Sequence, residues 1–108
     1  MPDYVREYIA EHSLLRVDDG WTWKFDASFV PRGMHEEPET NARNLDRIRC
    51  PVSYVYGDLS AVVTRELAHA IVERLPQGRG PIAIPQAHHH VLLDQPLSLV
   101  SALKAVLY

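Results

Sequence analysis

Three consecutive histidines near the C-terminal end are the residues best suited to carry chemistry. His88, His89 and His90 follow an apolar run and precede the tripeptide D-Q-P. The unperturbed pKa of histidine is about 6.5, so an imidazole can accept a proton and return it near neutral pH. Neutral imidazole also binds zinc and nickel, but adjacent loop histidines point in different directions, and we find no carboxylate or cysteine at ligand spacing. The run therefore predicts proton transfer, with no cofactor, no specific metal site and only adventitious nickel binding.

The elements around the histidines follow a strand–helix–strand–helix order. Residues 51–57 (PVSYVYG) form a β-branched and aromatic run closed by glycine, which predicts a buried strand. Thr64 is a candidate N-cap for the next helix, which we expect to end at 76–78. Residues 81–85 predict a second strand, and Pro96 opens a final amphipathic helix. This order predicts an α/β fold with parallel strands joined by a right-handed crossover.

The first 44 residues have a different character. Residues 4–16 place apolar side chains near helical spacing, and the D-D-G sequence at 18–20 is typical of a turn. In 21–25 aromatic and polar residues alternate, which favours a half-buried extended segment whose aromatics join a core. The alternative is that Trp21, Trp23 and Phe25 line a substrate pocket. Residues 28–44 are rich in Pro, Glu, Asn and Arg and predict an exposed connection. We therefore divide the chain into 1–44 and 45–108.

Composition limits the possible classes of function. With 108 residues, 46% of them hydrophobic, the chain is one domain at most and has a modest core. The formal charge of −3 and the scattered basic residues argue against nucleic acid as a partner. We find no signal peptide and no stretch long enough to span a membrane, so the cytoplasm is the expected location. Cys50 is the single cysteine, which excludes an internal disulfide.

The order of motifs in the second half resembles the last two strands of an α/β-hydrolase. The matching pieces are PVSYVYGDLS, a helix, PIAIPQAHHHVLLDQP and a second helix, and residues 17–29 (VDDGWTWKFDASF) are similar to the stretch that leaves the family's cap region. The resemblance covers nearly the whole chain. It implies the C-terminal part of an α/β-hydrolase fold, with a short parallel strand pair flanked by helices in 45–108, preceded by a remnant of the cap region in 1–44.

The resemblance also implies a role for one histidine. The family's catalytic histidine follows a pattern like G-A-G-H-H, and aligning that pattern with 86–90 places the general base at His89. His88 and His90 remain alternatives, because glutamine and histidine replace the two glycines.

The acid that orients the family's histidine often follows the glycine turn as G-x-x-D. In this chain the turn is Gly57, Asp58, Leu59 and Ser60, so serine stands where the carboxylate would be. Asp58 is displaced by two positions and is expected to point elsewhere. Other members carry the acid after an earlier strand, which has no counterpart in this sequence.

The family's nucleophile sits in G-x-S-x-G at a sharp strand-to-helix turn. The serines of this chain all lack glycines two positions away on both sides: Ser13, Ser28, Ser53, Ser60, Ser98 and Ser101. We therefore expect a chain derived from a hydrolase that cleaves ester, amide or similar bonds in small molecules. Without the nucleophile it should be inactive alone, and it should accept a small-molecule substrate only when the site is completed. The alternative is a non-catalytic interaction module. The strand at 52–56 has a partner on one side only, and its open edge would favour self-association or binding of a complementary chain.

Overall fold

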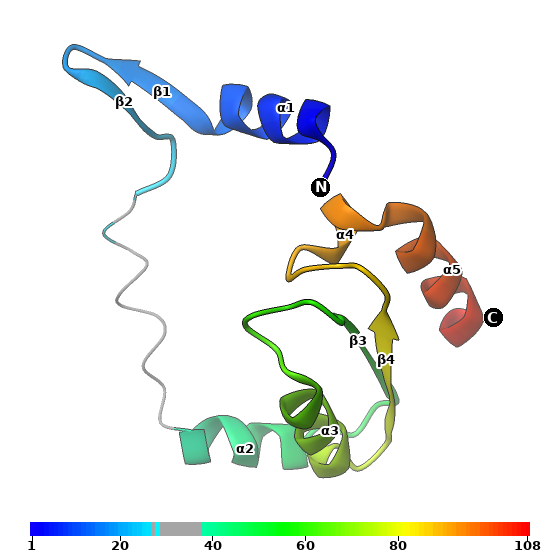
Figure 1. Ribbon diagram of the computed structural model, residues 1–108. Helices are drawn as coiled ribbons and strands as arrows, with labels where there is room; N and C mark the ends of the chain where they lie inside the picture. The colour runs from blue at the N-terminus through cyan, green and yellow to red at the C-terminus, as the bar shows by residue number, and fades with distance from the viewer. Residues whose placement is uncertain (27, 29–37) are drawn as a thin grey trace. The chain divides into compact units, whose positions relative to one another are not determined.

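The computed structural model describes residues 1–26, 28 and 38–108, and it divides the chain into two compact units, Met1–Glu37 and Pro38–Tyr108 (Figure 1). The sequence suggested a division after residue 44. Residues 38–44 belong with the second unit because they form part of helix α2 (Pro38–Asp46), which contacts helix α3 (Arg65–Arg74).

The first unit consists of one helix and one hairpin. Helix α1 (Asp3–Ser13) leads directly into β1 (Leu14–Val17), which pairs antiparallel with β2 (Gly20–Trp23). The predicted helix over 4–16 is therefore too long, because Leu14 has extended backbone angles and begins the strand. The predicted turn at 18–20 is confirmed, and Gly20 there has φ of +140°, a value that side chains rarely permit.

The aromatic side chains of this unit are exposed. The exposed fractions are 67% for Trp21, 52% for Trp23 and 54% for Phe25, so the prediction that they join a core is wrong. A two-stranded hairpin has no second layer of its own to cover its faces. The rings of Trp23 and Phe25 contact each other instead, with centroids 5.6 Å apart.

The second unit is built on a parallel strand pair, as the sequence predicted. Strand β3 (Val52–Gly57) pairs with β4 (Gly78–Ile84), with Val55 opposite Ile82 and Gly57 opposite Ile84. Helix α3 connects the two strands, which makes the parallel arrangement possible. The register shifts between Ser53 and Val55, and Gly80 on β4 has φ of +102° at this irregularity.

Helix α3 begins where the sequence predicted. The Thr64 side chain accepts a hydrogen bond from the backbone N–H of Leu67 at 3.2 Å, which satisfies a donor that the first helical turn leaves free. The helix packs against β4, and together with the strands it forms the small core of this unit. The buried hydrophobic residues among those described are Tyr56, Ala68, Leu75, Ile84 and Ala87.

Helix α2 occupies part of the stretch 28–44, which the sequence predicted to be an exposed connection. Residues 38–44 are helical, and 27 and 29–37 lie outside the described residues. The guanidinium of Arg74 donates to both carboxylate oxygens of Asp46, at 3.1 and 2.7 Å, and this pair joins α2 to α3. Gln77 Nε2 also donates to the backbone oxygen of Arg49 at 2.6 Å, so polar contacts hold this end of the unit.

The C-terminal residues form two helices. Helix α4 (Val91–Asp94) is a single turn, and α5 (Pro96–Leu107) begins with proline as predicted. Much of the apolar surface of α5 is exposed, including Leu97 at 81% and Leu107 at 71%. None of the helices in the described ranges has both the length and the apolar content needed to span a bilayer.

Candidate functional site

The turns that follow the two parallel strands meet at one edge of the sheet. Parallel strands end at the same edge, which brings the turn at 57–60 next to the histidine loop at 84–90. Asp58 N–H donates to Ile84 O at 3.1 Å, and Leu59 N–H donates to Ala87 O at 2.9 Å. Two backbone hydrogen bonds therefore fix one turn against the other.

Gly57 makes this close approach possible. A Cβ atom on this residue would lie 2.2 Å from the backbone oxygen of His88 and 2.3 Å from that of Ala87. Both are backbone atoms that cannot rotate away, so no other residue fits without separating the turn from the loop. The glycine that closes the predicted strand therefore also positions the histidine loop.

The loop itself adopts an unusual backbone conformation. Gln86 has φ of 58°, in the left-handed region that favours glycine. The family pattern that aligns with this position has glycine there, whereas this chain has glutamine. Ala87, the next residue, is fully buried, which anchors the loop on the core.

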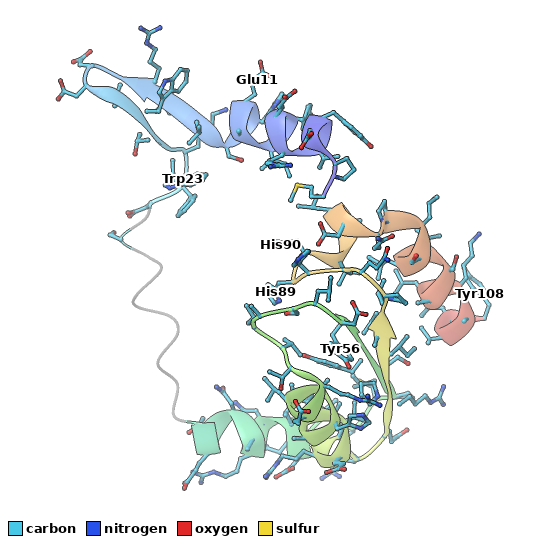
Figure 2. The ribbon with its side chains drawn as sticks, in the orientation of Figure 1. Glu11, Trp23, Tyr56, His89, His90 and Tyr108 are labelled. Carbon is cyan, nitrogen blue, oxygen red and sulfur yellow. The ribbon has the colours of Figure 1, made fainter. Side chains whose placement is uncertain are left out.

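His89 contacts the residue at the position of the family's acid. Its Nδ1 atom lies 3.4 Å from the Ser60 hydroxyl oxygen, a contact between residues 29 positions apart in sequence. Figure 2 shows His89 on the loop between β4 and α4, and its side chain is exposed. The hydroxyl oxygen of Ser60 also accepts backbone N–H groups from Val62 at 3.2 Å and Val63 at 3.0 Å.

His88 has a different partner, which the sequence did not reveal. Its backbone N–H donates to Asp94 Oδ2 at 2.7 Å, and its Nδ1 lies 3.1 Å from the same oxygen. In the sequence, the only signal for this contact is the short spacing between Asp94 and the histidines. Asp94 ends α4 and holds the preceding loop.

The remaining candidates lie apart from this contact. Asp58 lines a hollow of about 420 Å³ together with Tyr56, Arg65 and His69, as well as Pro81 and Ala83. His90 precedes α4 without a side-chain capping hydrogen bond, and its ring centroid is 5.4 Å from that of His89. Among the described residues, no three His, Cys, Asp or Glu side chains gather closely enough to hold a metal ion.

A second hollow lies within the first unit. It has a volume of about 590 Å³ and is lined by Glu7, Ala10, Glu11, Leu14 and Trp21. These lining residues are apolar side chains and two carboxylates, and none of them is a histidine. The chemistry that the sequence predicts is therefore concentrated at the end of the β3–β4 pair.

Comparisons with known proteins identify a similar esterase. The chain is 28% identical to the esterase Rv0045c of Mycobacterium tuberculosis (strain ATCC 25618 / H37Rv) over 102 residues, which are 89% of this chain and 31% of that protein. A solved structure of that esterase, described with its inhibition by transition metals, matches with a TM-score of 0.71 at 24% identity. It covers 96% of this chain and 40% of its own. A second structure of the same esterase gives a TM-score of 0.70 at 23% identity. No protein-family model matches the chain.

These matches confirm the predicted fold class. The chain is α/β, with a short parallel strand pair flanked by helices, and it corresponds to part of an α/β-hydrolase fold. It spans less than half the length of the esterase that it matches.

Proposed function

We propose that this chain carries the histidine end of an ester-hydrolysing site, with His89 as the general base. Its substrate would be a small molecule with an ester, amide or similar bond. The base would act on a serine hydroxyl from a nucleophile turn outside these 108 residues, because the sequence contains no G-x-S-x-G.

The observation that carries the proposal is the contact between His89 and Ser60. Ser60 occupies the place of the family's acid, and it is the residue whose side chain meets Nδ1 of His89. In a serine hydrolase, Nδ1 of the catalytic histidine faces the orienting residue, which leaves Nε2 to exchange a proton with the nucleophile. The contact between Nδ1 of His89 and Ser60, in the turn after β3, is consistent with this arrangement.

His88 is the less suitable base, although it has a carboxylate partner. The Asp94 oxygen that meets its ring also accepts its own backbone N–H, so the pair closes the loop on itself. This arrangement is typical of a residue that fixes a loop conformation. The similarity to an esterase supports the hydrolytic class of the reaction.

A chimeric enzyme tests the proposal. The segment of the esterase Rv0045c that aligns with this chain would be replaced by residues 1–108, and turnover of a p-nitrophenyl short-chain ester would be measured. We expect a His89→Ala substitution in the chimera to lower kcat by roughly 10²-fold or more, as expected for removal of a general base. The matched His88→Ala substitution should lower it by less than about tenfold.

Two outcomes would contradict the proposal. One is a folded chimera, with a circular dichroism spectrum like that of the esterase, that has no activity above background even when aspartate replaces Ser60 at the position of the family's acid. The other is a larger loss in His88→Ala than in His89→Ala, which would assign the base to the pair of His88 and Asp94.

One observation favours a second candidate function, a binding module without catalysis. Within the described residues β3 pairs with β4 alone, so its other edge presents unpaired backbone groups. A complementary chain could add a strand against 52–57. Sedimentation of the purified chain at high micromolar concentration tests self-association, and a clean monomer would count against it.

A further inference from the structure

The Ser60 hydroxyl makes three polar contacts, and their donors and acceptors can be assigned. The hydroxyl oxygen lies 3.2 Å from Val62 N, 3.0 Å from Val63 N and 3.4 Å from His89 Nδ1. A hydroxyl group has two lone pairs and one proton. Backbone N–H groups can only donate, so the two valines engage both lone pairs. The proton of Ser60 is what remains for His89.

We infer that Ser60 is a positioning residue that holds the neutral His89 ring in its Nε2–H tautomer. A neutral imidazole carries one proton, and the two ring nitrogens therefore have opposite roles. Nδ1 lies 3.4 Å from the hydroxyl oxygen of Ser60. With only its proton left for this contact, the hydroxyl donates and Nδ1 accepts. The ring proton then lies on Nε2, the nitrogen that faces away from Ser60.

This tautomer is the opposite of the one that a serine hydrolase requires. A general base takes the serine proton on Nε2, so Nδ1 must carry the ring proton and donate it to an acceptor. In this chain the acceptor position is occupied by a donor, and the base is available only through the minor tautomer. The residue at position 60 therefore limits how fast His89 can act as a base. This consequence for catalysis rests on the proposed function, whereas the inference about the tautomer does not rest on it.

Aspartate and asparagine at position 60 form a matched pair of variants. In both, a side-chain oxygen can accept the amides of Val62 and Val63, as Asx turns commonly do. The aspartate and asparagine side chains have the same shape, but they differ in the second group, which would face Nδ1 of His89. Ser60→Asp offers a second acceptor oxygen, whereas Ser60→Asn offers an NH₂ donor.

The tautomer can be read from two-bond ¹H–¹⁵N correlation spectra of the full-length ¹⁵N-labelled chain. The spectra would be recorded at alkaline pH, where an unperturbed imidazole is neutral. A His89→Gln variant identifies the His89 signals. We expect the Nε2–H pattern in the wild-type chain and in Ser60→Asn, and the Nδ1–H pattern in Ser60→Asp. An Nδ1–H pattern in the wild type, or no change in Ser60→Asp, would overturn the inference.

Ser60→Ala keeps the test decisive if the aspartate variant does not fold. It removes the hydroxyl proton, so the Nε2–H fraction of His89 should fall toward that of a histidine in a short unfolded peptide. An Nε2–H fraction equal to that of the wild type would overturn the inference.

The kinetic consequence is tested in the chimera with the esterase. Ser60→Asp should raise kcat by about 10²-fold or more, and Ser60→Asn should give no gain, because an amide in place of the orienting carboxylate costs roughly 10⁴-fold in a serine protease triad. The two proposals can fail separately. If the spectra show no preference for the Nε2–H tautomer but the chimera still loses activity in His89→Ala, only the role of Ser60 is overturned. If the spectra show the expected tautomers but the chimera keeps its activity in His89→Ala, only the proposed function is overturned.

Discussion

The two units of this chain differ in how their apolar residues are used. In the second unit, Tyr56, Ala68 and Ile84 are buried. In the described part of the first unit no residue is buried, and the large aromatic side chains of the hairpin are mostly exposed. Both units have regular secondary structure, but only the second has a core that can stabilise it.

This difference explains why the candidate site lies in the second unit. A catalytic or binding residue needs a supporting structure that holds its geometry. His89 has such support because Ala87 is buried two residues earlier and Gly57 allows the loop to lie against β3. Substitutions in the second unit should therefore affect both the stability of that unit and the site.

The largest effect is expected at Gly57. Gly57→Ala places a Cβ about 2.2 Å from the His88 backbone oxygen, so the turn and the loop must separate. We expect a loss of more than about 3 kcal/mol in the free energy of unfolding, measured by chemical denaturation followed by far-UV circular dichroism. In the first unit a Cβ on Gly20 meets no atom within 4 Å, but its φ of +140° strains any side chain there. Gly20→Ala should therefore weaken the hairpin, and an equally large shift in the unfolding transition of the second unit would contradict the assignment of the largest effect to Gly57.

A slightly smaller effect is expected from removing core volume. Ile84→Ala empties space around a residue that is 3% exposed and should cost about 3 kcal/mol. Trp21→Ser removes a larger side chain that is 67% exposed and should change the stability of the second unit by less than about 0.5 kcal/mol. Thermal unfolding of the two variants measures this contrast. Equal destabilisation would show that Trp21 belongs to the same core.

The cap of α3 makes a moderate contribution. Thr64→Ala removes the oxygen that accepts the Leu67 N–H and should cost about 1 kcal/mol. Thr64→Ser keeps this oxygen and serves as the control, with most of the stability retained. Denaturation midpoints measure both, and an equal loss in the two variants would argue against the capping bond.

The smallest effect concerns pH. The pKa of Glu66 is lowered by a hydrogen bond from its own backbone N–H and by one from the Thr64 side chain. A carboxyl group whose pKa is lower in the folded state stabilises the fold above its unfolded pKa, and this contribution is lost as pH falls through the folded value. The wild type should therefore be slightly more stable than Glu66→Gln at pH 7 and equal to it at pH 2. Glu73→Gln, later in α3, controls for loss of charge, and a difference that persists at pH 2 would contradict this account.

Local patterns predicted the elements of the second unit well. The β-branched run before Gly57 forms a strand, the threonine caps α3 and the proline begins α5, and each acts through neighbours in sequence. The predicted α/β order followed from them. The strand is less buried than predicted, because only its last two residues, Tyr56 and Gly57, are buried. The extent of α1 was predicted less accurately, because Leu14 has extended backbone angles and begins strand β1.

The features that the sequence did not predict depend on distant contacts. Helix α2 has few apolar residues, and its pairing of Asp46 with Arg74 joins positions 28 residues apart. The contact between Ser60 and His89 requires the parallel register of β3 and β4. The pattern of aromatics at 21–25 indicated burial, but it contained no information about whether a second layer covers the hairpin.

Turnover of a p-nitrophenyl short-chain ester by the purified 108-residue chain, run beside His89→Ala, tests whether this chain holds only the histidine end of the site. We predict equal rates for the two proteins, because no nucleophile turn is present for His89 to activate. Activity in the wild type that is lost in His89→Ala would contradict the account, since it would mean that a complete catalytic site forms within this chain.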